Sequence, residues 1–138
     1  MTKEIWINLP VKDVSKSKEF FSSLGFRLNT QMGNSADSAS FFIGEKNVVL
    51  MLFSEPMFKG FTSNELSDTK KGSEVLFSFD AESTEEVDEM AKKAVEAGGV
   101  LFSKPAFNQG WMYGCAFADL DGHRWNVLYM DFSKMPEQ

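Results

Sequence analysis

The sequence predicts an α+β fold made of two βαβββ modules. Apolar residues alternate with period two in several short segments, which is typical of strands. Two other segments have the apolar spacing and the capping residues of amphipathic helices. The order strand, helix, strand, strand, strand occurs twice, over residues 1–54 and again over 73–132. A repeat of this order, with a period of about 70 residues, predicts two similar modules within a single domain of 138 residues.

The first module begins with the strand "EIWINLPV", in which Trp6 and Asn8 share one face. The helix "DVSKSKEFFSSLGF" follows, with Asp13 or Ser15 as its N-cap and Gly25 as its C-terminal stop. Three strands then follow, which are separated by a polar stretch and a turn: "FRLNT", "ASFFIG" and "NVVLMLFS".

The second module repeats this order. The strand "SEVLFSFD" precedes the helix "STEEVDEMAKKAVEAGG", where Ser83 and Glu86 form a capping box and a glycine pair ends the helix. Strands are expected at "VLFSKPAF", "MYGCAFAD" and "HRWNVLYM". Residues 55–72 connect the modules and are long for a connection within a compact domain. They form either a lid that folds over a pocket or a surface crossover with a short helix.

Composition and charge exclude several classes of partner. The formal charge is −6. A chain this acidic is not expected to have the basic surface that phosphate binding needs, so nucleic acid is not an expected partner. No window reaches the roughly 20 apolar residues of a membrane span, and the N-terminus lacks the apolar core of a signal peptide. We therefore expect a cytoplasmic protein. The single cysteine, Cys115, excludes an intramolecular disulfide, and its apolar neighbours favour a buried, inert thiol.

The opening "INLPVKDVSKSKEFFSSLGF", the closing "FADLDGHRWNVLYMD" and the two modules together resemble the vicinal oxygen chelate superfamily. This superfamily includes glyoxalase I, extradiol dioxygenases, and the bleomycin and fosfomycin resistance proteins. The resemblance covers nearly the whole chain and is nearest to the branch named predicted lactoylglutathione lyase. It implies a single glyoxalase-like domain whose modules curl into cup-shaped mixed sheets, and a homodimer.

The resemblance also implies where a divalent metal would bind. The family's ligand positions, usually His or Glu, correspond here to Trp6, Met51, Glu74 and Asn126. Of these side chains only Glu74 is an ordinary ligand, because an indole N–H cannot coordinate a metal, thioether sulfur prefers soft metals, and an amide carries no charge. We therefore expect no bound metal and no cofactor.

Strand alternation predicts which side chains face into the cup. The inward set is apolar and aromatic with a few polar groups, which is typical of a small-molecule site; it comprises Trp6, Asn8, Met51, Phe53, Glu74, Leu76, Arg124, Asn126 and Leu128. Trp111 and Tyr113, in the loop that borders the cup mouth in the family, either line the ligand site or pack at a dimer contact.

Three functions remain open from the sequence. The first is binding of a small, flat or cationic organic molecule without a metal, with Glu74 as a counter-charge or in a structural pair with Arg124. The second is a glyoxalase-like lyase or isomerase in which Glu74 is the base and the metal is weak or displaced. The third is a structural dimer with a filled cup. Whether the chain is an enzyme is left open.

Overall fold

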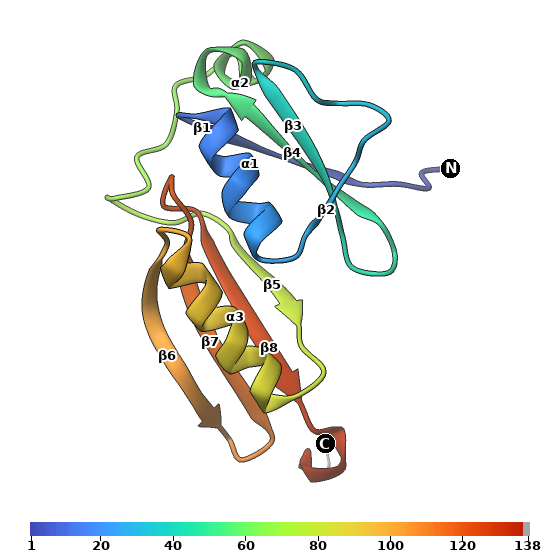
Figure 1. Ribbon diagram of the computed structural model, residues 1–138, viewed down its shortest axis with the longest axis vertical. Coiled ribbons are helices and arrows are strands. Elements are labelled where there is room, and N and C mark those ends of the chain that lie inside the picture. Colours follow the sequence, from blue (N-terminus) through green and yellow to red (C-terminus); the bar gives the residue numbers. More distant parts are fainter. Residues whose placement is uncertain (137–138) are drawn as a thin grey trace. The chain divides into compact units, whose positions relative to one another are not determined.

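The computed structural model describes residues 1–136 and confirms the predicted α+β fold. The chain forms two compact units, Met1–Asp68 and a second that begins at Thr69. Each unit contains a four-stranded mixed sheet with a helix packed against it (Figure 1). Within the described residues, no helix is long and apolar enough to cross a membrane.

The sheet of unit 1 has the strand order β1-β4-β3-β2. Strand β1 runs parallel to β4, while β3 is antiparallel to both β4 and β2. The elements follow one another along the chain as β1 (Trp6–Val11), α1 (Val14–Ser23), β2 (Arg27–Leu28), β3 (Ser38–Ile43), β4 (Val48–Ser54) and α2 (Glu55–Thr62).

Helix α1 covers one face of this sheet and forms the core of unit 1 with it (Figure 1). Asp13 is the N-cap, since its carboxylate accepts a hydrogen bond from the Lys16 N–H at 3.0 Å. Apolar side chains of the helix and of the sheet are almost completely buried, among them Phe20, Phe21, Phe41, Leu50 and Leu52. The alternate residues of β1 and β4 therefore face the opposite side of the sheet, which α1 leaves open.

The sheet of unit 2 has the order β5-β8-β7-β6, with β5 parallel to β8 and the other pairs antiparallel. Its elements are β5 (Leu76–Asp80), α3 (Thr84–Glu96), β6 (Val100–Asn108), β7 (Met112–Ala118), β8 (Arg124–Met130) and a short 3-10 turn (Phe132–Lys134). Helix α3 packs on one face of this sheet (Figure 1), where its Val87 and Ala94 and the strand residues Phe117, Trp125 and Val127 are buried.

Three segments differ in extent from the sequence prediction. Strand β2 has only two residues, because the chain after Leu28 turns into a hydrogen-bonded loop. Strand β5 begins at Leu76, so Glu74 lies in the bend before it. The 55–72 connection contains the short helix α2, which packs on β1 and β4 of unit 1.

Candidate ligand-binding cavity

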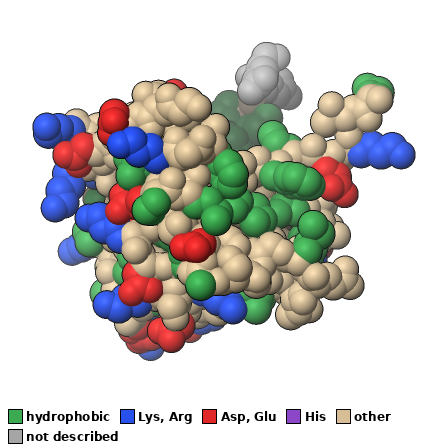
Figure 2. Space-filling view, turned by 90° about the horizontal axis from the view of Figure 1, so that it is seen from above, with side chains coloured by type: hydrophobic (Ala, Val, Ile, Leu, Met, Phe, Trp, Pro, Cys, Tyr) green, Lys and Arg blue, Asp and Glu red, His purple; other side chains and the backbone are tan. Residues whose placement is uncertain are grey.

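The open face of the unit 1 sheet holds a cavity of about 720 Å³. Five rings line it, from β1, β3, β4 and α2: Trp6, Phe42, Phe53, Phe58 and Phe61. Figure 2 shows hydrophobic side chains gathered in one area of the surface, beside the protruding N-terminal segment. The cavity lies wholly within one unit, and the residues of unit 1 are sufficient to form it.

The register of the parallel pair β1–β4 sets the floor of the cavity. Trp6 lies opposite Val49, Asn8 opposite Met51 and Pro10 opposite Phe53. Because side chains alternate along a strand, Trp6, Asn8, Met51 and Phe53 all share the open face. The structure thus brings together the four cavity residues that strand alternation predicted for the first module.

The loop after β2 forms one wall. Asn29 is buried, donates from Nδ2 to Ser40 Oγ at 3.4 Å, and accepts the Gln31 N–H at its Oδ1. Asn34 donates to the Asn29 carbonyl and accepts the Ser40 N–H at 3.1 Å. Gly33 has φ +85°, and a Cβ there would lie 2.8 Å from the Ser40 Cβ. The loop backbone therefore lies directly against the sheet.

Helix α2 forms the opposite wall. The ring of Phe61 meets that of Phe53 edge-to-face, with centroids 5.0 Å apart. Phe58 lines the cavity from the same helix. The helix ends at Ser63, which adopts the left-handed conformation with φ 52°. The connection between the modules therefore contains a short helix that forms a wall of the cavity, while its role as a lid stays a prediction.

Charged groups are confined to the rim. Among the described residues that line the cavity, Glu4 is the only charged one, and its side chain is exposed. Arg27 lies nearby along the sheet, where its guanidinium sits 5.0 Å from the centroid of the Phe42 ring and donates to Asn47 Oδ1. Because Phe42 and Asn47 line the cavity, a cation and a carboxylate both lie close to its outer end.

Four predicted residues of the second module lie on the face of the unit 2 sheet that α3 does not cover. Leu76 pairs with Arg124, and Asn126 and Leu128 follow on β8 with the same parity. Arg124 stacks over Phe102, 4.2 Å from its centroid. Asn126 donates to Ser78 Oγ at 3.4 Å. Arg124 therefore contacts a ring rather than pairing with Glu74, which is exposed in the bend before β5.

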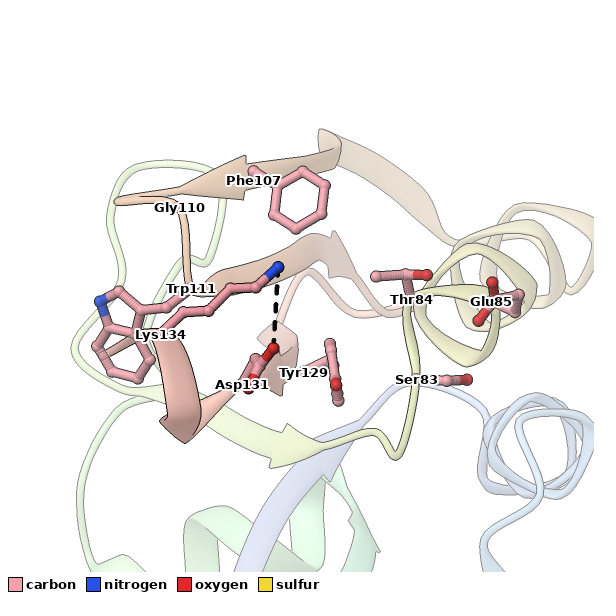
Figure 3. A pocket seen from close by; sticks show the side chains of 9 residues that line it. All are labelled: Ser83, Thr84, Glu85, Phe107, Gly110, Trp111, Tyr129, Asp131 and Lys134. Atoms are coloured by element: carbon pink, nitrogen blue, oxygen red, sulfur yellow. Dashed lines mark ion pairs between the residues drawn. The ribbon is translucent and has the colours of Figure 1, made fainter. Parts of the chain in front are cut away.

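Trp111 and Tyr113 lie elsewhere in unit 2. The Tyr113 hydroxyl donates to Asp88 of α3 at 2.6 Å, and this hydrogen bond is the main reason that the pKa of Tyr113 is raised. Trp111 lines a separate pocket of about 250 Å³ beside the start of α3. Figure 3 shows its indole nitrogen turned away from the space between Phe107 and Tyr129.

Asp119 organises the hairpin between β7 and β8. Its carboxylate accepts the N–H groups of Asp121 and His123, both at 3.0 Å, and the indole N–H of Trp125 at 3.1 Å. Burial raises the pKa of this carboxyl, while the charge of His123 and the three hydrogen bonds lower it. Asp119 thus fixes the start of β8 and has a structural role.

Sequence reasoning missed much of the cavity. Its prediction from strand alternation omitted Phe42, Phe58 and Phe61, as well as the polar residues Asn29, Gln31 and Ser40. Phe42 has the parity of the open face on β3, opposite Val49, and could have been found by that signal. Phe58 and Phe61 lie in the connecting segment, for which the sequence did not decide between a short helix and a lid. They are three residues apart, a spacing that places two side chains on one face of a helix.

The donor set does not fit a divalent metal. Of the four residues that the resemblance places at ligand positions, Trp6 and Met51 line the aromatic cavity of unit 1, while Asn126 contacts Ser78 and Glu74 lies in the bend before β5. Within residues 1–136, no three His, Cys, Asp or Glu side chains lie together in a way that could hold a metal ion.

Comparison with known proteins identifies the family. Residues 5–127 match the family model of the Glyoxalase/Bleomycin resistance protein/Dioxygenase superfamily. The chain belongs to this superfamily. A hypothetical protein from S. aureus is 34% identical, with 93% of this chain and 94% of that chain covered and a TM-score of 0.80. Comparison with curated proteins gives no significant match.

Other members of the superfamily share the fold at lower identity. A glyoxalase/bleomycin resistance protein/dioxygenase family enzyme from Burkholderia phytofirmans is 18% identical over 91% of this chain and 97% of that one, with a TM-score of 0.77. The manganese-bound fosfomycin resistance protein of Listeria monocytogenes is 17% identical over 97% and 94%, with a TM-score of 0.69. The lactoylglutathione lyase branch, the homodimer and the cytoplasmic location stay predictions.

Proposed function

We propose that this member of the superfamily binds a small, flat or cationic organic molecule in the unit 1 cavity, without a metal. The observation that carries the proposal is the cavity itself, about 720 Å³ and lined by five aromatic rings and Met51. Pockets for small molecules typically measure about 300–1,000 Å³ and combine apolar walls with a few polar groups.

The exposure of the rings supports a ligand site rather than a filled core. Trp6 is 60% exposed and Phe61 is 65% exposed, whereas Phe20, Phe21 and Phe41 on the α1 side are at most 2% exposed. Leaving large rings in water forgoes roughly 1.5–3 kcal/mol for each. A flat molecule placed between Trp6 and the α2 rings would recover part of this free energy.

The chemistry of the lining favours uncharged or cationic ligands. Ring faces carry partial negative charge and attract cations as well as other rings. Glu4 adds a carboxylate at the rim, and no basic residue lines the cavity within the part of the chain that the structure describes. The lining does not offer the cluster of basic side chains that recognises phosphate or other strong anions.

Replacement of a single ring tests the proposal. A library of flat aromatic and quaternary ammonium compounds is screened by thermal shift on chelator-treated protein, and the affinities of the hits are measured by calorimetry. Phe61→Ala removes the α2 ring and should weaken the hits about five- to tenfold, the equivalent of one ring contact.

Phe107→Ala is the matched control, because Phe107 lies in unit 2 and is 64% exposed, much like Phe61. This variant should leave affinity unchanged. The proposal is contradicted if no compound in the library binds, or if Phe61→Ala and Phe107→Ala behave alike.

A further inference from the structure

We infer that Asn8 selects the ligand, and that the ligand is a flat, neutral molecule with adjacent N–H and C=O groups on one edge, as in a lactam or a carboxamide. This inference rests on the proposed function, because it assigns a ligand class to the same cavity. It starts from the state of the polar side chains that line the cavity.

Most of these polar groups already have partners. Asn29 and Ser40 are bonded to each other. Asn47 accepts from Arg27, and the Thr62 hydroxyl donates to the Lys59 carbonyl at 3.3 Å. These groups shape the walls, and using them for a ligand would require breaking or sharing their bonds.

Asn8 is different. Its side chain makes no hydrogen bond with any other residue in the described part of the chain, and it is exposed on the floor of the cavity. Its amide offers both an N–H donor and a C=O acceptor side by side. Gln31 offers the same groups, but it lies on the loop wall, whereas Asn8 lies within the hydrogen-bonded strand β1.

The neighbours of Asn8 specify a flat partner. Trp6 lies two residues away on the same face, a rise of about 6.6 Å along a strand. Met51 lies directly opposite on β4, and Phe53 follows on the same face. A planar molecule that covers these apolar side chains would present its edge to the Asn8 amide. Two hydrogen bonds in parallel then fix its orientation, as side-chain amides do with the edge of adenine.

The rim charges favour a neutral ligand over a cation. Glu4 is exposed at the outer end, where water screens its charge. The guanidinium of Arg27 lies over Phe42, a ring that lines the same cavity. The positive charge of Arg27 offsets the attraction of Glu4 for a cation.

A matched set of probes tests the inference by calorimetry. 2-Quinolone presents the required N–H and C=O edge, and N-methyl-2-quinolone blocks only the donor. The native protein should bind 2-quinolone roughly tenfold more tightly, the equivalent of the one hydrogen bond lost. Asn8→Leu, which keeps the size of the side chain, should bind both compounds equally.

Asn8→Asp replaces the donor with a second acceptor. This variant should prefer protonated 2-aminoquinoline, which presents two N–H donors, over 2-quinolone. Circular dichroism establishes that both variants are folded. Equal binding of the two quinolones by the native protein would overturn the inference. So would a preference for 2-quinolone over its N-methyl form that survives in Asn8→Leu, or a preference for 2-quinolone over 2-aminoquinoline that survives in Asn8→Asp.

The inference and the proposed function fail in different ways. If other flat or cationic compounds bind at the cavity but 2-quinolone has no advantage over its N-methyl form, only the inference fails. If no flat or cationic compound binds, both fail.

Discussion

Single residues have well-separated roles in this chain. Asp119 and Asn8 both carry polar side chains, yet only 5% of Asp119 is exposed and its carboxylate accepts three hydrogen bonds, whereas the Asn8 side chain makes none within the described residues. The first arrangement stabilises a hairpin. The second leaves hydrogen-bonding capacity for a ligand. The two residues differ in role because their side chains differ in burial and in hydrogen-bond partners, not because one is Asp and the other Asn.

Replacement of Asp119 should destabilise the fold. Asp119→Asn leaves one oxygen in place of two, so the Trp125 indole or the two backbone N–H groups lose their acceptor. We expect a loss of about 1–3 kcal/mol in the free energy of unfolding by urea denaturation. Asp80→Asn is the control, because Asp80 is exposed on β5, and it should change stability by less than about 0.5 kcal/mol. Equal effects of the two substitutions would show that the Asp119 hydrogen bonds contribute nothing.

The pH dependence of this loss follows from the raised pKa of Asp119. The folded state holds the proton of this carboxyl more tightly than the unfolded state does. Its contribution to stability is therefore fully present below the unfolded-state pKa and declines as pH rises through the raised folded-state value. The difference in stability between the native protein and Asp119→Asn should decrease over the same interval.

Strand alternation predicted the residues of the cavity floor because the register of β1 and β4 is regular. The same argument placed Glu74 on a strand, but β5 begins at Leu76, which pairs with the first residue of β8, Arg124. Glu74 therefore precedes the paired region, where alternation no longer determines the direction of a side chain. The residue at which strand pairing begins or ends depends on the position of the partner strand. The local sequence pattern carries no information about that position.

At the scale of the elements, the loop after β2 shows why the walls were harder to predict than the floor. Its polar sequence indicated only a connection, yet Asn29 and Asn34 fold it back on Ser40. Side-chain hydrogen bonds to backbone groups compete with strand pairing, which accounts for the two-residue length of β2. The walls arise from contacts between residues distant in the sequence.

Gly33 tests whether this loop shapes the cavity. In Gly33→Ala the new Cβ would lie 2.8 Å from the Ser40 Cβ and 3.1 Å from the Met51 Cε, so the loop must move. We expect a loss of about 2 kcal/mol in unfolding free energy and weaker binding of the cavity ligand, measured by calorimetry.

Gly44→Ala separates the two causes of this loss. Gly44 also has a positive φ, +71°, but a Cβ there meets nothing within 4 Å. This variant should lose only the roughly 1 kcal/mol of left-handed strain and keep its ligand affinity. Loss of affinity in both variants, or in neither, would contradict the assigned role of the loop.

At the scale of the whole molecule, the order of elements was predictable because the two modules repeat it, and the superfamily match covers residues from both modules. The resemblance also implied four ligand positions. At three of these positions the resemblance places Trp6, Met51 and Asn126, whose side chains are not ordinary ligands. Neither the repeat nor the resemblance predicted the α2 rings that complete the cavity. Their position depends on where the connecting helix packs against the sheet.

The central claim is that the unit 1 cavity binds a flat organic molecule without a metal, and an amide NMR titration of chelator-treated protein tests it most directly. With 2-quinolone as the probe, the account predicts saturable shifts at Trp6, Asn8, Met51 and Phe61, and none that require added Zn²⁺, Ni²⁺ or Mn²⁺. Shifts confined to the unit that begins at Thr69, or binding that appears only after a metal is added, would contradict it.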